Sequence, residues 1–288
     1  MSPITRRLLN AVPLSLQRLL PVELRADARD WLGRPQPGDI GFVPEPPHPG
    51  PGERTGPPDF VAVGNADAGG EWWMSRIAEH PGVAPNRTLG EAAHFFARYC
   101  TDRFDVDEVA RFHALFPRGP GRAIGHWAPD GLVYPWVAPL LAEAAPRAHL
   151  LVLVRDPVER LRAGLERTTA ERAPHVGSNL ADAVDRGFYA DQLARLLQWF
   201  PKSQVRVLQY ERCLADPEGA LAQTYAFLGV DDTYRARRLD PPAESVRDPL
   251  SPATRQRLVG LYADDVAALG QLVPDIDLAL WPNFAPRH

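Results

Sequence analysis

Two short segments of this chain carry residue types and spacing that suit acid–base chemistry. The first is a glycine-rich turn that contains Asp67 and Glu71. The second, residues 125–129, reads Gly-His-Trp-Ala-Pro and contains His126. A histidine beside a carboxylate can move protons or orient a nucleophile. The sequence therefore indicates His126, Asp67 and Glu71 as candidate acid–base groups.

His126 is open to three interpretations at this point. It can be a structural histidine whose ring is bonded to a backbone carbonyl, which is the usual role of a lone histidine. It can be a general base on its own, or one half of an acid–base pair with Asp67 or Glu71. The two carboxylates have an alternative role as well, because acidic side chains stabilise the N-terminus of a helix.

Aromatic residues crowd both segments. They are Trp72, Trp73, Trp127, Tyr134 and Trp136. Aromatic side chains at strand ends suit a cleft for an apolar or ring-containing ligand, and ordinary core packing is the alternative. We take Trp72, Trp73, Trp127 and Tyr134 as candidate substrate-pocket residues.

Apolar runs that end at turn residues predict the elements that position these groups. The predicted strands are 60–63, which ends at Gly64, together with 149–154 and 205–210. The predicted helices are 71–80, 157–172, 187–200 and 217–228. Strands that alternate with helices predict an α/β fold with a parallel sheet, which binds ligands at the carboxyl ends of its strands.

The chain divides by composition into three parts. Residues 1–33 hold arginines among leucines and predict a helical arm, which either docks on the main domain or lies on a membrane surface. Residues 34–57 are a connector rich in proline and glycine. Residues 58–288 form the predicted main domain.

The overall composition excludes several classes of partner and ligand. A net charge of −4 gives no global attraction for nucleic acid or anionic membrane. No apolar run is long enough to predict a membrane span. Two isolated cysteines suit a reducing cytoplasm, and no histidine or cysteine spacing predicts a metal site.

Several segments, taken together and in order, resemble the sulfotransferase family, especially its heparan-sulfate-type and bacterial members. They include Pro58 to Gly64, His94-Phe95-Phe96, Arg155-Asp156-Pro157, Tyr210-Glu211 and Phe227-Leu228-Gly229. The resemblance covers about residues 58–281. It implies a P-loop-like α/β fold and transfer of a sulfuryl group from 3′-phosphoadenosine 5′-phosphosulfate (PAPS) to a hydroxyl or an amine. It also implies that His94 supports the wall of the cleft, so His94 joins the candidate substrate-pocket residues.

The resemblance assigns cofactor-binding roles to four residues if a nucleotide binds. They are Gly64, Gly69, Gly70 and Arg155. Backbone N–H groups of a glycine-rich loop and the following helix hold phosphate groups, and an arginine binds the 3′-phosphate.

The sequence departs from the family pattern at the positions that carry the chemistry. Asp67 stands where the family loop has a lysine, and Gly70 and Glu71 replace a pair of hydroxyl residues. His126 and Trp127 replace a catalytic glutamate and a second lysine. A carboxylate about 4 Å from a phosphate costs on the order of 4 kcal/mol at an effective dielectric constant of about 20. Of the expected polar groups for PAPS, Arg155 is the one clearly retained, because Ala163 also replaces a serine.

Three functional hypotheses follow. The first is a diverged enzyme that needs no cofactor and performs acid–base chemistry: cyclisation, dehydration, isomerisation or hydrolysis. Its substrate would be a small molecule or a carrier-bound intermediate, as in secondary metabolism. The second is a PAPS-dependent sulfotransferase with His126 as the base, and the third is a non-catalytic binding protein.

Overall fold

The structure is a computed structural model that describes residues 44–88, 90–100, 102–170, 180–241 and 250–285. The predicted arm, 1–33, lies outside the described residues, and so does the first part of the connector. From residue 44 onward the connector runs beside the segment that precedes β3, where Arg54 forms an antiparallel bridge with Arg118. The domain boundary at residue 58 stays a prediction.

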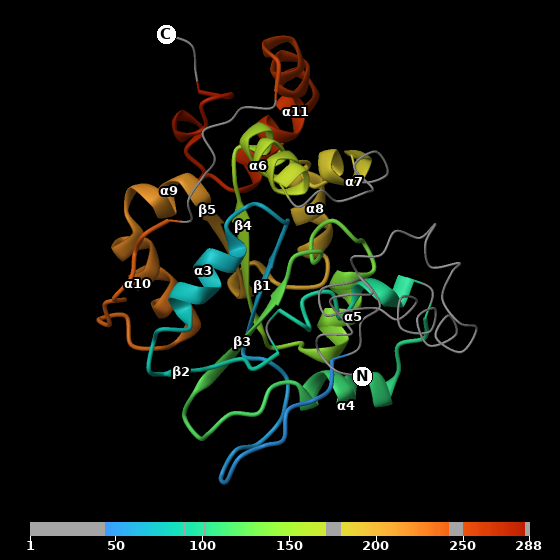
Figure 1. Cartoon of the computed structure of the whole chain (residues 1–288), viewed down its shortest axis with the longest axis vertical. Helices are drawn as coiled ribbons and strands as arrows, with labels where there is room; N and C mark the ends of the chain where they lie inside the picture. The colour runs from blue at the N-terminus through green and yellow to red at the C-terminus, as the bar shows by residue number, and fades with distance from the viewer. Residues whose placement is uncertain (1–43, 89, 101, 171–179, 242–249, 286–288) are drawn as a thin grey trace, which may run out of the picture.

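A five-stranded parallel sheet forms the centre of the described chain, as predicted (Figure 1). Its strand order is β2-β3-β1-β4-β5. The strands are β1 (Phe60–Gly64), β2 (Val83–Ala84), β3 (Ala123–Ala128), β4 (His149–Val154) and β5 (Val205–Gln209). Each ladder is parallel, and β1 pairs with both β3 and β4. The strands β1, β4 and β5 match the predicted ones, whereas β2 and β3 were not predicted.

Helices connect the strands and also follow the last of them. They are α3 (Gly70–Ile77), α4 (Val106–Ala114), α5 (Val137–Ala144), α6 (Pro157–Ala170), α7 (Leu180–Asp185), α8 (Tyr189–Leu196), α9 (Tyr210–Ala215), α10 (Pro217–Leu228) and α11 (Pro252–Leu272). Short 3₁₀ turns lie at Ala97–Cys100, Lys202–Gln204 and Leu278–Leu280. Helix α10 has the predicted bounds and ends at Gly229, whose φ of 70° suits a residue without a Cβ.

Two apolar cores cover the two faces of the sheet. Helices α4, α5, α6, α8 and α11 contribute to the first core, which contains Val61 of β1. Helices α3, α9 and α10 contribute to the second core, which contains Ala62 of β1. Neighbouring residues of a strand therefore face different cores, as the pleat requires.

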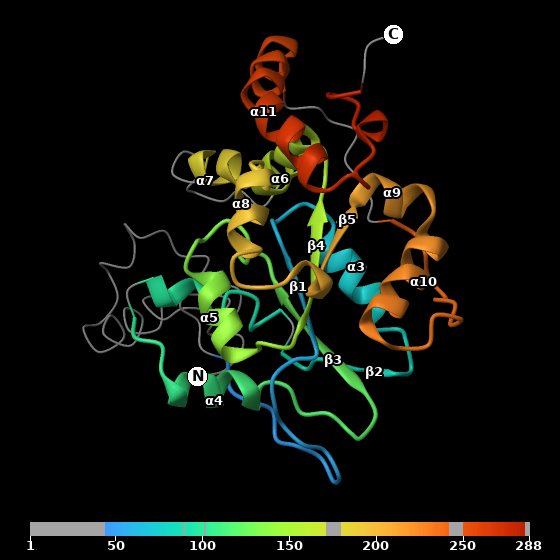
Figure 2. The ribbon, with the colours of Figure 1, turned by 180° about the vertical axis from the view of Figure 1, so that it is seen from behind.

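The loops that follow β1, β3, β4 and β5 all lie at one edge of the sheet, because parallel strands end on the same side. Figure 2 shows α11 and the segment after it beside the ends of β4 and β5. Hydrogen bonds between Gln209 and Asp277 fix this segment there. The carboxyl edge therefore gathers loops that are far apart in the sequence.

Candidate active site

The loop between β1 and α3, residues 65–69, contains two residues with a left-handed backbone conformation. Asp67 and Gly69 have φ values of 66° and 88°, in the left-handed region. Aspartate is among the few residues besides glycine that enter this region readily. Helix α3 then begins at Gly70, and no side chain caps it at Gly69. The loop therefore combines a helix start that no side chain caps with the carboxylate of Asp67.

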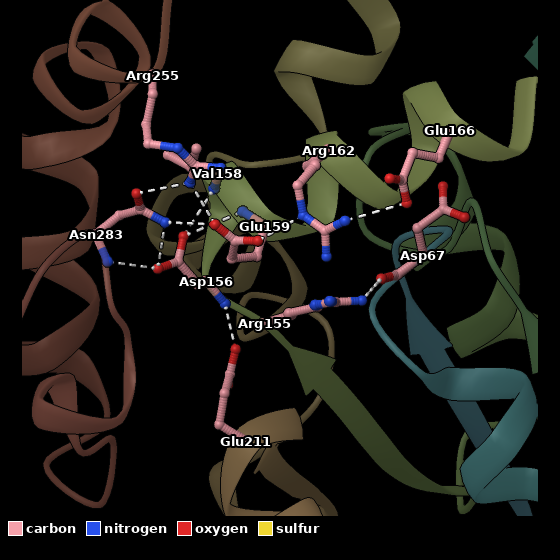
Figure 3. Close-up of polar contacts among 10 residues, drawn as sticks. All are labelled: Asp67, Arg155, Asp156, Val158, Glu159, Arg162, Glu166, Glu211, Arg255 and Asn283. Carbon is pink, nitrogen blue, oxygen red and sulfur yellow. Dashed lines mark hydrogen bonds and ion pairs between the residues drawn. The ribbon is translucent and has the colours of Figure 1, made fainter. Parts of the chain in front are cut away.

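The side chain of Asp67 reaches toward α6. Its Oδ2 atom lies 2.8 Å from the position that a Cβ on Gly164 would occupy, so a larger residue at 164 would collide with it. Arg155 donates from Nη1 to the backbone oxygen of Asp67 at 3.3 Å, as Figure 3 shows. Its guanidinium also lies over the ring of Tyr210, 4.6 Å from the centroid. Arg155 is therefore engaged by the protein's own loop and aromatic ring.

Trp127 packs directly against the start of α3. A Cβ on Gly70 would lie 2.0 Å from Cη2 of Trp127, and one on Gly64 would lie 3.5 Å from the same atom. A Cβ on Gly69 would likewise lie 2.3 Å from Cδ2 of Tyr210. The glycines predicted to bind a cofactor thus make room for aromatic rings in this structure.

The two tryptophans of α3 lie in the second core. Trp73 is fully buried, and its indole N–H donates to Thr224 at 3.3 Å. Trp72 is nearly buried, and its indole N–H donates to the backbone of Asp240 at 2.9 Å. Glu71 lies exposed in the first turn of the same helix. The contacts of both indoles are those of core packing.

His126 lies inside the first core. Its side chain is 0% exposed, and its ring meets Phe112 and Phe116 at centroid distances of 5.4 and 5.5 Å. Neither ring nitrogen has a hydrogen-bond partner among the described residues. Burial, with a smaller contribution from the charge of His94, lowers the pKa of His126 to about 3. The ring is therefore neutral at neutral pH.

His126 is also remote from the two carboxylates proposed as its partners. It pairs in register with Val61, three residues before the end of β1. At about 3.3 Å per residue, that position is about 10 Å into the sheet from the β1–α3 loop. The structure does not bring His126 together with Asp67 or Glu71.

A different histidine has a carboxylate partner at the carboxyl edge. Nδ1 of His94 forms a hydrogen bond with Oδ2 of Asp130, which lies two residues after β3. The side chain of Asp130 is 5% exposed, and that of His94 is 25% exposed. When Nδ1 donates to a buried carboxylate, Nε2 is left as the proton acceptor. This pair can work as a general base, whereas the family resemblance implies for His94 only a place in the wall of the cleft.

Arg186 holds Asp130 from its other side. Its Nη2 atom lies 2.8 Å from Oδ1 of Asp130, and its Nε atom lies 2.8 Å from Asp182. Burial alone would raise the pKa of Asp130, but the hydrogen bond from His94 and the charge of Arg186 outweigh it and hold that pKa below its usual value. Asp130 is therefore a stable carboxylate for His94.

The β1–α3 loop is tied to this network. Nδ2 of Asn65 donates to the backbone oxygen of Arg186 at 2.6 Å and to Gln192 at 2.8 Å. The ring of Tyr134 lies 5.7 Å from the Arg186 guanidinium and stacks on Trp136 at 4.8 Å. The network around Arg186 therefore brings the β1–α3 loop and Tyr134, one of the candidate pocket residues, to the carboxyl edge of the sheet.

Tyr134 and Trp136 border the pair formed by His94 and Asp130. The indole N–H of Trp136 donates to the backbone of Phe96 at 3.2 Å, two residues from His94. Burial, and then the charges of Asp130 and Asp182, raise the pKa of Tyr134. Its phenol therefore stays protonated at neutral pH.

The described residues contain neither a candidate metal site nor a membrane-spanning helix. Within the described ranges, no group of three or more His, Cys, Asp or Glu residues is arranged to hold a metal ion. Among the helices that the structure describes, none is long and apolar enough to cross a membrane.

Comparison with known proteins identifies the family. The family model described as "Sulfotransferase family" matches residues 77–234, and the chain belongs to that family. A crystal structure of a sulfotransferase from Alicyclobacillus acidocaldarius is 25% identical and has a TM-score of 0.63. The match covers 77% of this chain and 98% of that one.

Two more distant solved structures also match. The sulfotransferase domain from the Synechococcus PCC 7002 olefin synthase is 17% identical, with a TM-score of 0.46 over 78% of this chain and 98% of that one. The mouse sulfotransferase SULT7A1, solved as a complex with PAP, is 14% identical, with a TM-score of 0.42 over 75% of this chain and 88% of that one.

Proposed function

We propose that this member of the sulfotransferase family is an enzyme that works without PAPS and performs acid–base chemistry on a small-molecule or carrier-bound substrate. The observation that carries the proposal is the contact between His94 and Asp130, backed by Arg186, at the carboxyl edge of the sheet. General bases of this type contribute about 10²- to 10⁴-fold to a reaction rate.

The residues at the cofactor position do not fit PAPS. The loop offers the carboxylate of Asp67 where a polyanion needs a cation, and Arg155 is already bonded to the loop backbone. Trp127 lies against the first residue of α3, the place where a helix N-terminus would receive a phosphate. Each carboxylate at contact distance from a phosphate opposes binding by about 4 kcal/mol.

The packing around these residues argues against simple loss of function. Gly70, Gly69 and Gly164 accept Trp127, Tyr210 and Asp67 respectively. Each of these three side chains thus packs against a glycine, at a position where the Cβ of any other residue would collide with it. Such matched packing is expected of a site kept in a new form, so we rank a non-catalytic binding protein below an enzyme.

In the proposed reaction, Nε2 of His94 takes a proton from the substrate. Asp130 holds the ring in the required tautomer and stabilises the imidazolium that forms. Arg186 keeps Asp130 ionised and in place, and so acts as a positioning residue. The sequence indicated His126, Asp67 and Glu71 as the acid–base groups, and the proposed reaction uses His94 as the base instead. For His126 we propose a role in core packing.

PAPS-dependent sulfuryl transfer remains the second candidate. Family membership and the retained Arg155 at the end of β4 favour it. Under this alternative, backbone amides of the β1–α3 loop would carry the nucleotide, and a histidine would take the proton of the acceptor hydroxyl or amine.

The test compares extracts of cells that carry the gene after incubation with three proteins. They are the wild type, His94→Gln and His126→Phe. Mass spectrometry then shows which metabolite changes. Loss of water, gain of water or isomerisation, abolished by His94→Gln and retained in His126→Phe, is the expected result. A product heavier by a sulfuryl group would establish the second candidate.

A further inference from the structure

Tyr134 is tied to the segment around His94 by two separate sets of contacts. Its backbone N–H donates to the backbone oxygen of Asp130 at 3.2 Å, so both residues belong to one turn after β3. The side chain of Asp130 in turn bonds to His94. On the other side, the ring of Tyr134 stacks on Trp136 with the two planes 6° apart. The indole N–H of Trp136 donates to Phe96, which closes the circuit two residues from His94.

Arg186 contacts both the carboxylate and the phenol. Its Nη2 atom lies 2.8 Å from Oδ1 of Asp130, and its guanidinium carbon lies 5.7 Å from the centroid of the Tyr134 ring. A guanidinium has donors and no acceptor, so its hydrogen bond with Tyr134 is donated to the phenol oxygen. That bond does not use the phenol proton, which can therefore be given to a ligand. The charge of Arg186 would then stabilise the phenolate that remains.

The two groups that can exchange protons with a ligand are the accessible ones. The side chain of His94 is 25% exposed, and Tyr134 is half-buried. Asp130 and Arg186, which carry the charges behind them, are both buried. Burial, followed by the charges of Asp130 and Asp182, raises the pKa of Tyr134, so the phenol holds its proton at neutral pH.

We propose that Tyr134 is the proton donor that acts opposite His94, and that the two remove water from a β-hydroxy carbonyl compound. This inference rests on the proposed function, because it takes His94 as the base. An imidazole is too weak a base for an unactivated C–H bond, so the carbon that loses a proton must adjoin a carbonyl group. Hydroxide is a poor leaving group, so the hydroxyl needs a proton, which a phenol beside Arg186 can supply.

The reaction has two steps. Nε2 of His94 takes the proton from the carbon next to the carbonyl, and the electron pair of that C–H bond forms an enolate. The enolate then re-forms the carbonyl and makes a C=C bond, while the C–O bond of the hydroxyl breaks. The hydroxyl leaves as water with the proton of Tyr134. Transfer of one proton from the imidazolium to the phenolate through solvent restores both groups, and no oxidant or reductant is needed.

Incubation of the cell extracts in heavy water separates the two steps. Mass spectrometry follows the metabolite that the wild type converts to a product lighter by one water, and it also detects carbon-bound deuterium in the remaining substrate. Tyr134→Phe keeps the stacked ring and removes the phenol proton. It should lose water about 100-fold more slowly than the wild type, while His94 still exchanges deuterium into the substrate. His94→Gln should support neither step.

Two further variants sharpen the test. Tyr234→Phe is the matched control, because Tyr234 is also half-buried and its hydroxyl donates to the backbone of Glu79, just after α3. It should convert the substrate at the wild-type rate. Trp136→Phe keeps the aromatic stack and removes the N–H that Phe96 accepts. It should slow water loss more than deuterium exchange, and equal slowing of the two steps would contradict the proposal.

The outcomes distinguish the proton donor from the base. Water loss at the wild-type rate in Tyr134→Phe would overturn the proton donor and leave His94 as the base. Loss of exchange together with water loss in that variant would also overturn it, because removal of a proton donor spares the first step. A wild type that isomerises its substrate without loss of water would overturn the assigned reaction. Conversion that survives in His94→Gln, or no conversion by the wild type, would instead refute the proposed function.

Discussion

His94 and His126 show how the surroundings of a side chain decide its chemistry. Both were candidates from the sequence, and His126 ranked higher because the family resemblance placed it at the catalytic position. The structure encloses His126 between phenylalanines and gives His94 a buried carboxylate and a partly exposed ring. Asp130 was missed because it is two residues beyond a strand that the sequence did not reveal.

The buried state of His126 predicts a loss of stability in acid. Its pKa is about 3 in the folded chain and about 6.5 when unfolded, so the unfolded chain binds the extra proton between these values. Stability is therefore complete above about pH 6.5 and falls as the pH drops through it. Urea unfolding should show that the free energy of unfolding of the wild type falls by about 2 kcal/mol more between pH 7 and pH 5 than that of His126→Phe. Parallel losses in both proteins would show that His126 does not titrate in this way.

At the scale of elements, the sequence predicted those parts whose local pattern is clear. Strands β1, β4 and β5 are continuous apolar runs, and α10 has a proline at its start and a glycine after its end. Strand β3 was not predicted because Gly125 and His126 interrupt its apolar character. Its strand form depends on pairing with β1, which no local pattern shows.

The contact between Trp127 and Gly70 predicts a coupled effect on stability. Gly70→Ala would bring a Cβ to 2.0 Å from the indole, and such overpacking costs about 1–3 kcal/mol. In a Trp127→Ala background the same change should leave the free energy of unfolding unchanged or raise it by up to about 1 kcal/mol, because alanine has a higher helix propensity than glycine. A double-mutant cycle by denaturant unfolding measures the difference. Equal effects of Gly70→Ala in both backgrounds would show that the indole does not set the requirement for glycine.

At the scale of the whole molecule, the candidate site is assembled from segments that the sequence could not pair. Asn65 follows β1, Asp130 follows β3, and Arg186 precedes α8. The prediction of a parallel sheet located the edge where such residues meet, and the structure confirmed that sheet. The identity of the partners depends on loop conformation and side-chain packing, which composition and periodicity do not specify.

Arg186 should therefore matter to the fold as a whole. Arg186→Met leaves Asp130 buried without its guanidinium partner, and breaking such a pair costs about 3–5 kcal/mol. The surface pair of Arg195 and Asp191 offers a matched control, because Arg195→Met should cost less than about 1 kcal/mol. Denaturant unfolding of both variants measures the contrast. Similar small losses in both would show that the network around Asp130 contributes little to stability.

Our central proposal is that this member of the sulfotransferase family does not bind PAPS. Calorimetric titration of adenosine 3′,5′-bisphosphate into the purified chain tests it most directly, with Arg155→Ala as the matched variant. The carboxylate of Asp67 and the indole of Trp127 predict no saturable heat at millimolar ligand. Saturable binding at micromolar concentration in the wild type, lost in Arg155→Ala, would contradict the account and restore PAPS-dependent sulfuryl transfer.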